Sequence, residues 1–153
     1  MRRQNTHLQD ASDAYGEPSN CRVIDPAHVV ATWADRGIWI DAWTYGGMPA
    51  GEDGCVSPEL IYVSEIRLTG NRWTTSLGLR VGDPTAKLRR LYRRAQFHRV
   101  PRRAYWLVTR HGPCIGVCTQ QEQRNGVDYP RLTAQVRGNR VAALWVPVFG
   151  QGE

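Results

Sequence analysis

The sequence predicts an α+β domain: an antiparallel sheet with one main helix, over about residues 83–95, packed on one face. Two observations predict this class. The segment from Trp73 to Ala95 changes from a short strand, through a turn, to apolar residues with helical spacing. Elsewhere, aromatic and β-branched residues gather in short runs that Gly, Pro and Asn separate. Six Trp, six Tyr and two Phe in 153 residues supply enough apolar area for a core.

The main helix has a start signal, an apolar stripe and a basic face. Asp83 is a suitable N-cap, and Pro84 suits the first helical position because its missing N–H needs no partner there. The predicted apolar stripe, at i, i+3, i+4 and i+7, consists of Leu88, Leu91, Tyr92 and Ala95. The predicted basic face consists of Lys87, Arg89, Arg90, Arg93 and Arg94.

The other elements follow from local signals. Residues 1–20 are polar and predict a flexible tail, which leaves residues 21–150 as a single domain. Capping and turn residues predict a shorter helix over residues 26–36. Gly138-Asn139 predicts a hairpin turn between two strands. Strands are predicted over residues 38–45, 60–69, 72–76, 104–109, 114–119, 132–136 and 140–146, and loops over 46–58, 96–103 and 120–129.

The run LGLRVGD at residues 77–83, followed by a short helix, resembles the "GL-x-VGD" turn of a family of small actinobacterial exported proteins of unknown function. The strand WLV at residues 106–108 and the hairpin over residues 130–141 match later motifs of that family. A shorter glycine-then-helix likeness extends to lipoproteins of outer-membrane assembly and to β-lactamase-inhibitor-like domains. The resemblance covers about half of the chain. It implies export, with no assigned activity and no catalytic residue to carry over.

The redox state of the four cysteines indicates the cellular compartment in which the protein works. An even number in a small Trp- and Gly-rich chain predicts two disulfides, with free buried thiols or a metal site as the alternatives. Three connectivities are possible, and one of them joins Cys114 to Cys118 in a small loop and Cys21 to Cys55. The cysteine spacing does not favour a zinc site, because such sites usually have two closely spaced cysteine pairs and this sequence has one. With disulfides the chain is secreted or exposed at the cell surface, and without them it is cytoplasmic.

The positive charge is unevenly distributed. The net charge is +6, yet residues 84–121 contain nine Lys and Arg and no acid, whereas the rest has 11 basic residues against 14 acidic ones. Such a cluster indicates either a solvated helix face with a basic loop or a surface for an anionic partner. The candidate binding residues of this segment are Arg89, Arg90, Arg93, Arg94, Arg99, Arg102 and Arg103.

Aromatic residues supply two further candidates. The arginines alternate with Tyr92, Phe97, Tyr105 and Trp106, an arrangement that suits stacking of nucleic-acid bases if the rings are exposed. Tyr92 belongs to the predicted apolar stripe, however, and Trp106 to a strand expected to face the core, which leaves the arginines without a clear stacking platform. Trp39 and Trp43 share one face of a predicted strand, where they serve sugar or protein binding if exposed and belong to the core if a second layer covers them. The prediction favours the core.

Catalytic signals are weak. The chain has no nucleophile elbow, no HExxH motif and no phosphate-binding loop with its lysine. His111 stands three residues before Cys114, which leaves a thiolate–imidazole pair as an alternative to a surface turn. Asp41 and Glu65 are among five acids, with Glu52, Asp53 and Glu59, that nothing in the sequence brings to a defined separation.

These observations favour a secreted, non-enzymatic domain that binds a protein or an anionic surface. The first alternative is a nucleic-acid-binding module that uses residues 84–103, and the second is a small hydrolase-type enzyme. The sequence predicts no cofactor, no metal and no membrane span, because no apolar run approaches the roughly 20 residues that a span needs. The first residues lack the apolar core of a signal peptide.

Overall fold

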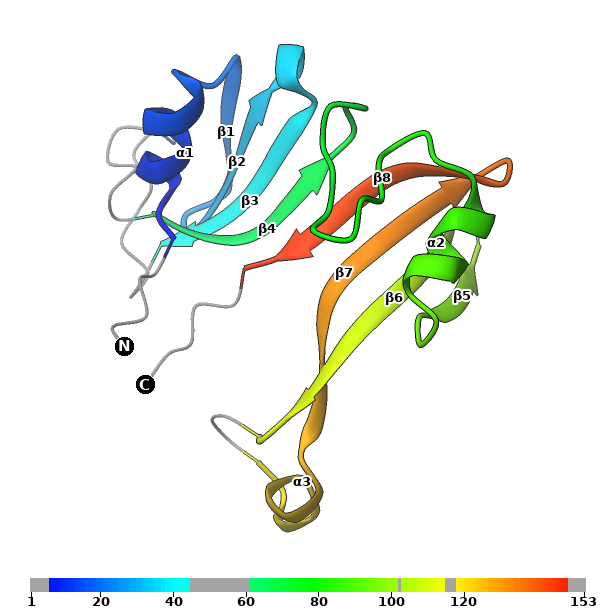
Figure 1. Cartoon of the computed structure of the whole chain (residues 1–153). Coiled ribbons are helices and arrows are strands. Elements are labelled where there is room, and N and C mark those ends of the chain that lie inside the picture. The colour runs from blue at the N-terminus through cyan, green and yellow to red at the C-terminus, as the bar shows by residue number, and fades with distance from the viewer. Residues whose placement is uncertain (1–5, 45–60, 102, 115–117, 149–153) are drawn as a thin grey trace. The chain divides into compact units, whose positions relative to one another are not determined.

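The computed structural model describes residues 6–44, 61–101, 103–114 and 118–148 (Figure 1). Contacts within the chain divide it into two compact units. Unit 1 is Met1–Leu68 with Val148–Gly150, and unit 2 is Thr69–Pro147 with Gln151–Glu153. Each unit contains an antiparallel sheet and buried apolar residues, and each is described by itself. The single domain expected over residues 21–150 stays a prediction.

In the described part of unit 1, a short helix precedes four strands. The elements are α1 (Leu8–Tyr15), β1 (Asn20–Asp25), β2 (His28–Trp33), the 3-10 turn η1 (Ala34–Arg36), β3 (Ile38–Thr44) and β4 (Ile61–Leu68). The strands follow the order β1-β2-β3-β4, and every neighbouring pair is antiparallel. Strands β3 and β4 confirm two of the strands that the alternating pattern predicts, with slightly different ends.

One face of the unit 1 sheet forms its core. Alternate residues of β3, namely Ile38, Ile40 and Ala42, are at most 2% exposed, and Trp33 of β2 is 1% exposed. Helix α1 covers this face, because Leu8 is buried and the carbonyl at the end of the helix, on Gly16, accepts a 2.7 Å hydrogen bond from Trp33 Nε1. The other residues of β3 therefore lie on the opposite face of the sheet.

The helix predicted over residues 26–36 is wrong. Residues 28–33 form β2, and only residues 34–36 make a turn of 3-10 helix. Asp25 does not cap a helix. Its Oδ1 accepts a 2.9 Å hydrogen bond from the N–H of Ala27 and closes the turn between β1 and β2. The β-branched residues Val29 and Val30, both buried, favour a strand between neighbours.

Residues 8–15, which the polar composition places in a flexible tail, form helix α1. Leu8 and Ala11, three residues apart, are buried, and the polar side chains occupy the rest of the helix surface. The segment before the helix is also held: the Thr6 carbonyl accepts a 2.9 Å hydrogen bond from the Val63 N–H. Two apolar residues among many polar ones give a helical pattern too short to recognise in the sequence.

In the described part of unit 2, four strands and two short helices follow. The elements are α2 (Thr85–Leu91), β5 (Gln96–Val100), β6 (Arg103–Gly112), α3 (Gln120–Asn125), β7 (Val127–Arg137) and β8 (Arg140–Pro147). The strands follow the order β8-β7-β6-β5, again with antiparallel neighbours (Figure 1). The hairpin predicted around Gly138-Asn139 is confirmed as β7–β8. Both turn residues have positive φ, 53° and 61°, as a two-residue hairpin turn requires.

Helix α2 is shorter than the helix predicted over residues 83–95. The Asp83 side chain does not cap it: the carboxylate accepts a 2.8 Å hydrogen bond from the Arg80 N–H and closes the preceding turn. The helix ends before Tyr92, whose hydroxyl donates a 2.8 Å hydrogen bond to Thr75 Oγ1. Leu88 is fully buried, and a backbone bridge between Pro84 and Arg140 attaches the start of the helix to β8.

The α+β prediction with one main helix is therefore wrong, because strands dominate the described chain and none of its helices exceeds eight residues. Part of the predicted basic loop over residues 96–103 is strand β5. The predicted strand over residues 72–76 contributes only an isolated bridge between Thr74 and Arg80. The described residues of the predicted strand over 114–119 carry a disulfide and precede α3. Over residues 96–100 a predicted loop is thus a strand, and over residues 72–76 a predicted strand is an irregular segment with one bridge.

Candidate functional site

Arginines of helix α2 and of the turn that follows it line a shallow groove against strand β6 in unit 2. This α2 groove has a volume of about 520 Å³ and is lined by Ala86, Arg89, Arg90, Tyr92, Arg93 and Trp106. Burial of Leu88 fixes the rotation of the helix, so the neighbouring residues Arg89 and Arg90 are exposed. Basic residues in the last turn also suit the negative end of the helix dipole.

Trp106 forms the aromatic part of the α2 groove. It is half-buried on β6, and the guanidinium carbon of Arg89 lies 5.9 Å from its ring centroid, in cation–π geometry. Phe97, the partner of Trp106 on β5, has its ring centroid 5.3 Å away at an interplanar angle of 47°. Phe97 is 50% exposed. The groove thus joins guanidinium groups to aromatic surface that solvent reaches.

A second hollow lies at the end of the β5–β6 hairpin. This hairpin groove has a volume of about 560 Å³ and is lined by Arg99, Val100, Pro101, Arg103, Ala104, Val136 and Gly138. Ala104 and Trp106 are two residues apart on β6, so their side chains lie on the same face of the sheet. Arg99 and Phe97, their partners on β5, share that face. The part of the hairpin groove formed by Arg99 and Ala104 therefore lies on the same face of the unit 2 sheet as Trp106, whereas Val100 and Arg103 lie on the other face at the end of the hairpin.

The charge of the grooves is uncompensated within the described residues. No acid lies between residues 84 and 121, and none of the groove arginines forms an ion pair with a described carboxylate. The exception in the helix is Lys87, whose Nζ lies 2.7 Å from Asp83 Oδ2. The hydrogen bond from Lys87, helped by one from the Arg80 N–H, lowers the pKa of the Asp83 carboxyl. The carboxylate that precedes the helix thus pairs with the lysine and not with a groove arginine.

The structure distributes the predicted binding arginines over the two grooves. Arg89, Arg90 and Arg93 line the α2 groove, and Arg99 and Arg103 line the hairpin groove. Arg94 is exposed in the turn before β5 and lines neither. Arg102 lies outside the described residues.

Trp39 and Trp43 belong to unit 1, where they lie on the face of β3 opposite the core. Trp39 is half-buried and Trp43 is 45% exposed, so neither ring belongs to the buried apolar core that the sequence reading favours. Tyr45, the next residue of that pattern, lies outside the described residues. The role of the two tryptophans in binding stays a prediction.

A polar cluster on the same face of unit 1 is absent from the sequence prediction. Asp41 is its centre: Oδ2 lies 2.6 Å from His28 Nε2, and Oδ1 accepts hydrogen bonds from Ser64 Oγ (2.8 Å) and Trp43 Nε1 (3.0 Å). The His28 ring stacks on Trp43, with centroids 4.3 Å apart. Burial, and then the charge of Asp41, raises the pKa of Glu65, its partner on β4. The serine bonds to the aspartate rather than to the histidine, so this is not the order of a catalytic triad.

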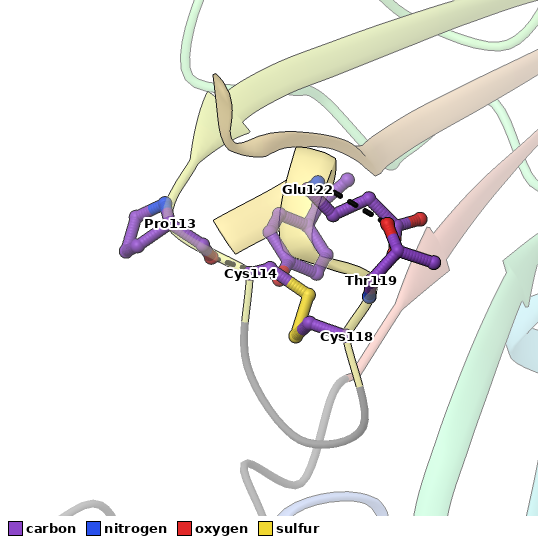
Figure 2. Close-up of a disulfide and its surroundings, with 6 residues drawn as sticks. Pro113, Cys114, Cys118, Thr119 and Glu122 are labelled. Atoms are coloured by element: carbon purple, nitrogen blue, oxygen red, sulfur yellow. Dashed lines mark hydrogen bonds between the residues drawn. A yellow bond between two sulfur atoms is a disulfide. The ribbon is translucent and has the colours of Figure 1, made fainter. Parts of the chain in front are cut away.

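The disulfide predicted between Cys114 and Cys118 is confirmed, with Cα atoms 6.2 Å apart (Figure 2). Next to it, Thr119 and Glu122 form a capping box at the start of α3. The backbone N–H of Thr119 lowers the pKa of the Glu122 carboxyl. Cys21 is also disulfide-bonded, and its predicted partner, Cys55, lies outside the described residues.

The disulfide removes the thiolate from the proposed His111/Cys114 pair. A disulfide sulfur is not a nucleophile, and His111 Nδ1 instead lies 2.9 Å from Asp128 Oδ1. Within the described ranges, no group of three or more His, Cys, Asp or Glu side chains is placed to hold a metal ion. None of the helices in those ranges combines the length and apolar character of a membrane span.

Comparison with known proteins gives only remote likenesses. No protein-family model and no curated protein matches the chain. A cysteine-rich secretory protein from Staphylococcus aureus aligns with a TM-score of 0.46 and 10% identity, over 94% of this chain and 44% of that one. An extracellular protein containing an SCP domain, from Bacillus anthracis, aligns with a TM-score of 0.46 and 8% identity, over 94% and 43%. The chain spans less than half of either protein, and likeness at this level supports no conclusion about function.

Proposed function

We propose that this chain is an exported, disulfide-bonded binding domain that holds an anionic partner in the α2 and hairpin grooves. The observation that carries the proposal is the clustering of Arg89, Arg90 and Arg93 around Trp106, without a described carboxylate to neutralise them. Guanidinium groups bind carboxylates and phosphates through paired hydrogen bonds, and an adjacent aromatic surface strengthens such contacts by excluding water.

The disulfides support export. Cys114–Cys118 and the bonded Cys21 need an oxidising compartment, because glutathione and thioredoxin keep thiols reduced in most cytosols. Membership of the exported actinobacterial family with the GL-x-VGD turn is part of the same proposal. It is supported by the residues that carry the resemblance and by the turn they form, in which the Gly82 N–H donates a 2.7 Å hydrogen bond to the Val141 carbonyl.

The test is binding of fluorescent poly-L-glutamate and heparin, measured by anisotropy at increasing NaCl concentration. Replacing Arg89, Arg90 and Arg93 together by Gln should weaken binding roughly tenfold or more and reduce its salt dependence, because exposed charge contacts contribute about 0.2–1 kcal/mol each. The matched control replaces three other exposed arginines, Arg22, Arg124 and Arg131, by Gln. Equal weakening by both triple variants would show that net charge alone causes binding, and would contradict the proposal.

Nucleic-acid binding through residues 84–103 is the second candidate function, favoured by the exposed ring of Phe97 beside Trp106. Arginines that track a phosphate backbone and aromatic rings that stack on bases are the features of sequence-tolerant single-strand binders. A labelled oligothymidylate in the same titration tests it. Tighter binding than to heparin, lost on replacing Phe97 by Ala, would make this the leading function.

A further inference from the structure

Strand β5 is the open edge of the unit 2 sheet. It pairs with β6 on one side, and the strand order ends there. No described residue outside β6 donates to or accepts from its backbone. In an antiparallel pair, alternate residues direct their N–H and C=O groups away from the neighbouring strand. The outer backbone groups of β5 are therefore free to pair with another strand.

Two of the usual devices that protect such an edge, proline and a β-bulge, are missing from β5. The five residues of the strand include no proline, and its register with β6 runs without a bulge from Gln96 to Val100. By contrast, the register of β6 with β7 and that of β7 with β8 both contain a shift. Charge is the one protective feature, since Arg99 lies in the strand, and a charge of one sign repels only partners of that sign.

Arginines stand at both ends of this edge. Arg93 and Arg94 stand three and two residues before the first residue of β5, whereas Arg99 and Arg103 lie at its far end. All four are exposed, and none forms an ion pair with a described acid. Five residues of strand span about 17 Å. An added strand of similar length would thus place both of its ends beside guanidinium groups.

Between the arginines, β5 offers apolar surface on each face. Phe97 is 50% exposed and Val100 is 42% exposed. Because the two residues are an odd number of positions apart, their side chains lie on opposite faces of the sheet. A neighbouring strand with apolar residues at alternate positions would cover Phe97 and extend its contact with Trp106.

We infer that the edge of β5 binds an extended acidic segment of another protein, which adds a strand to the unit 2 sheet. Its backbone pairs with the outer groups of β5, and its acidic residues, one group near each end, meet Arg93 and Arg94 on one side and Arg99 and Arg103 on the other. This inference rests on the proposed function and deepens it. Charge recognition belongs to the arginines, and the open edge specifies that the anion is a polypeptide.

A nucleic acid would use this surface less completely. Arg89 already lies over the face of Trp106, and the Phe97 ring is tilted by 47° to it, so the two rings do not form a parallel platform for bases. A nucleic acid also leaves the strand edge unpaired, because it has no regular row of donors and acceptors at the spacing of a β-ladder.

The experiment compares three fluorescent probes of equal net charge on the full chain. The first is a peptide of about nine residues with Asp-Glu at each end and alternating Thr and Val between them, a length set by β5 and its flanking arginines. The second is the same peptide with alternate amides N-methylated on the edge that faces β5, which removes the donors and keeps the charge. The third is single-stranded DNA. The expected result is salt-dependent binding of the first peptide, weakened roughly tenfold or more by N-methylation.

Variants separate this inference from the proposed function. Arg99→Glu should weaken peptide binding roughly tenfold, whereas the control Arg22→Glu, in an exposed position on β1 of unit 1, should leave it unchanged. Equal binding of both peptides, or DNA binding tighter than peptide binding, would overturn strand addition while leaving an arginine-dependent anion site in place. Failure of all three probes to bind would overturn both.

Discussion

At the residue scale, the polar contacts of this protein are mostly built around single carboxylates. Asp41 accepts hydrogen bonds from two side chains and faces His28, Asp83 holds Lys87, and Asp128 holds His111. Each carboxylate therefore neutralises or orients a nearby donor within the fold. The arginines of the two grooves have no such partner among the described residues, and this difference in pairing is the reason why we propose them as a binding surface.

The His111–Asp128 pair predicts a pH-dependent contribution to stability. The hydrogen bond that the His111 ring donates to the Asp128 carboxylate, followed by one to the Asn125 backbone, raises the pKa of His111 above its ordinary 6.5. The folded state therefore holds the proton more tightly than the unfolded chain. The stabilisation is complete below the ordinary pKa and disappears as the pH rises through the folded pKa. Replacing His111 by Gln should lower the free energy of unfolding near pH 5.5 more than near pH 8.5, as measured by urea denaturation.

An NMR titration of His111 provides the control for that measurement. Replacing Asp128 by Asn should return the pKa of His111 towards its ordinary value. It should also lower the free energy of unfolding at acid pH, as the His111 variant does. A difference between wild type and variant that grows with rising pH would contradict the assignment.

At the element scale, Gly126 connects helix α3 to strand β7 in a conformation that suits only glycine. Its φ is 75° and its ψ is −178°, and a Cβ would lie 2.5 Å from the Gly112 carbonyl oxygen and 2.8 Å from His111 Nε2. Replacing it by Ala should lower the free energy of unfolding by about 2 kcal/mol or more, measured by chemical denaturation. Gly112→Ala is the matched control, since its Cβ would meet only Tyr129 ring carbons, at 3.7 and 3.8 Å. Equal losses for the two variants would refute this role.

Local sequence signals predict some elements and mislead on others for identifiable reasons. The β7–β8 hairpin is predictable because Gly138-Asn139 stands between alternating apolar residues. Strand β2 is not, because Asp25-Pro26 signals a helix start and a tight turn equally well, and only pairing with β1 and β3 decides between them. The basic composition of β5 likewise predicts a loop, because the strand conformation of these residues depends on their pairing with β6.

At the scale of the whole molecule, the sequence predicts the groove arginines from a run without acids, but not their grouping. Trp106 joins Arg89, Arg90 and Arg93 only because β6 extends through that position, and Arg99 reaches Ala104 only through the β5–β6 register. The sequence does not predict the polar cluster of Asp41 and His28, because its local signals place His28 in a helix, whereas His28 lies in strand β2. To predict which side chains meet across strands that are distant in sequence, the register of the strands must be known, and composition and periodicity do not define it.

Peptide mapping under non-reducing conditions tests the covalent structure of the chain. We expect Cys114 and Cys118 in one internally linked peptide, and the peptide that contains Cys21 in a second linkage, for which the sequence predicts Cys55 as the partner. Replacing Cys114 and Cys118 by Ser should lower the free energy of unfolding by about 2 kcal/mol, which is at the low end for a disulfide because the closed loop is short. Free thiols detected by alkylation without reductant would contradict the disulfides and, with them, the argument for export.

Lys87 pairs with Asp83 and lines neither of the two grooves. Lys87 is the single lysine of the sequence, so every cation in the two grooves is a guanidinium, a group that stays protonated at any pH a protein tolerates. The positive charge offered to a partner is therefore constant from acid to alkaline surroundings. Outside a cell, where acidity is not buffered, such a surface would hold or release its partner according to ionic strength and to the protonation of the partner alone.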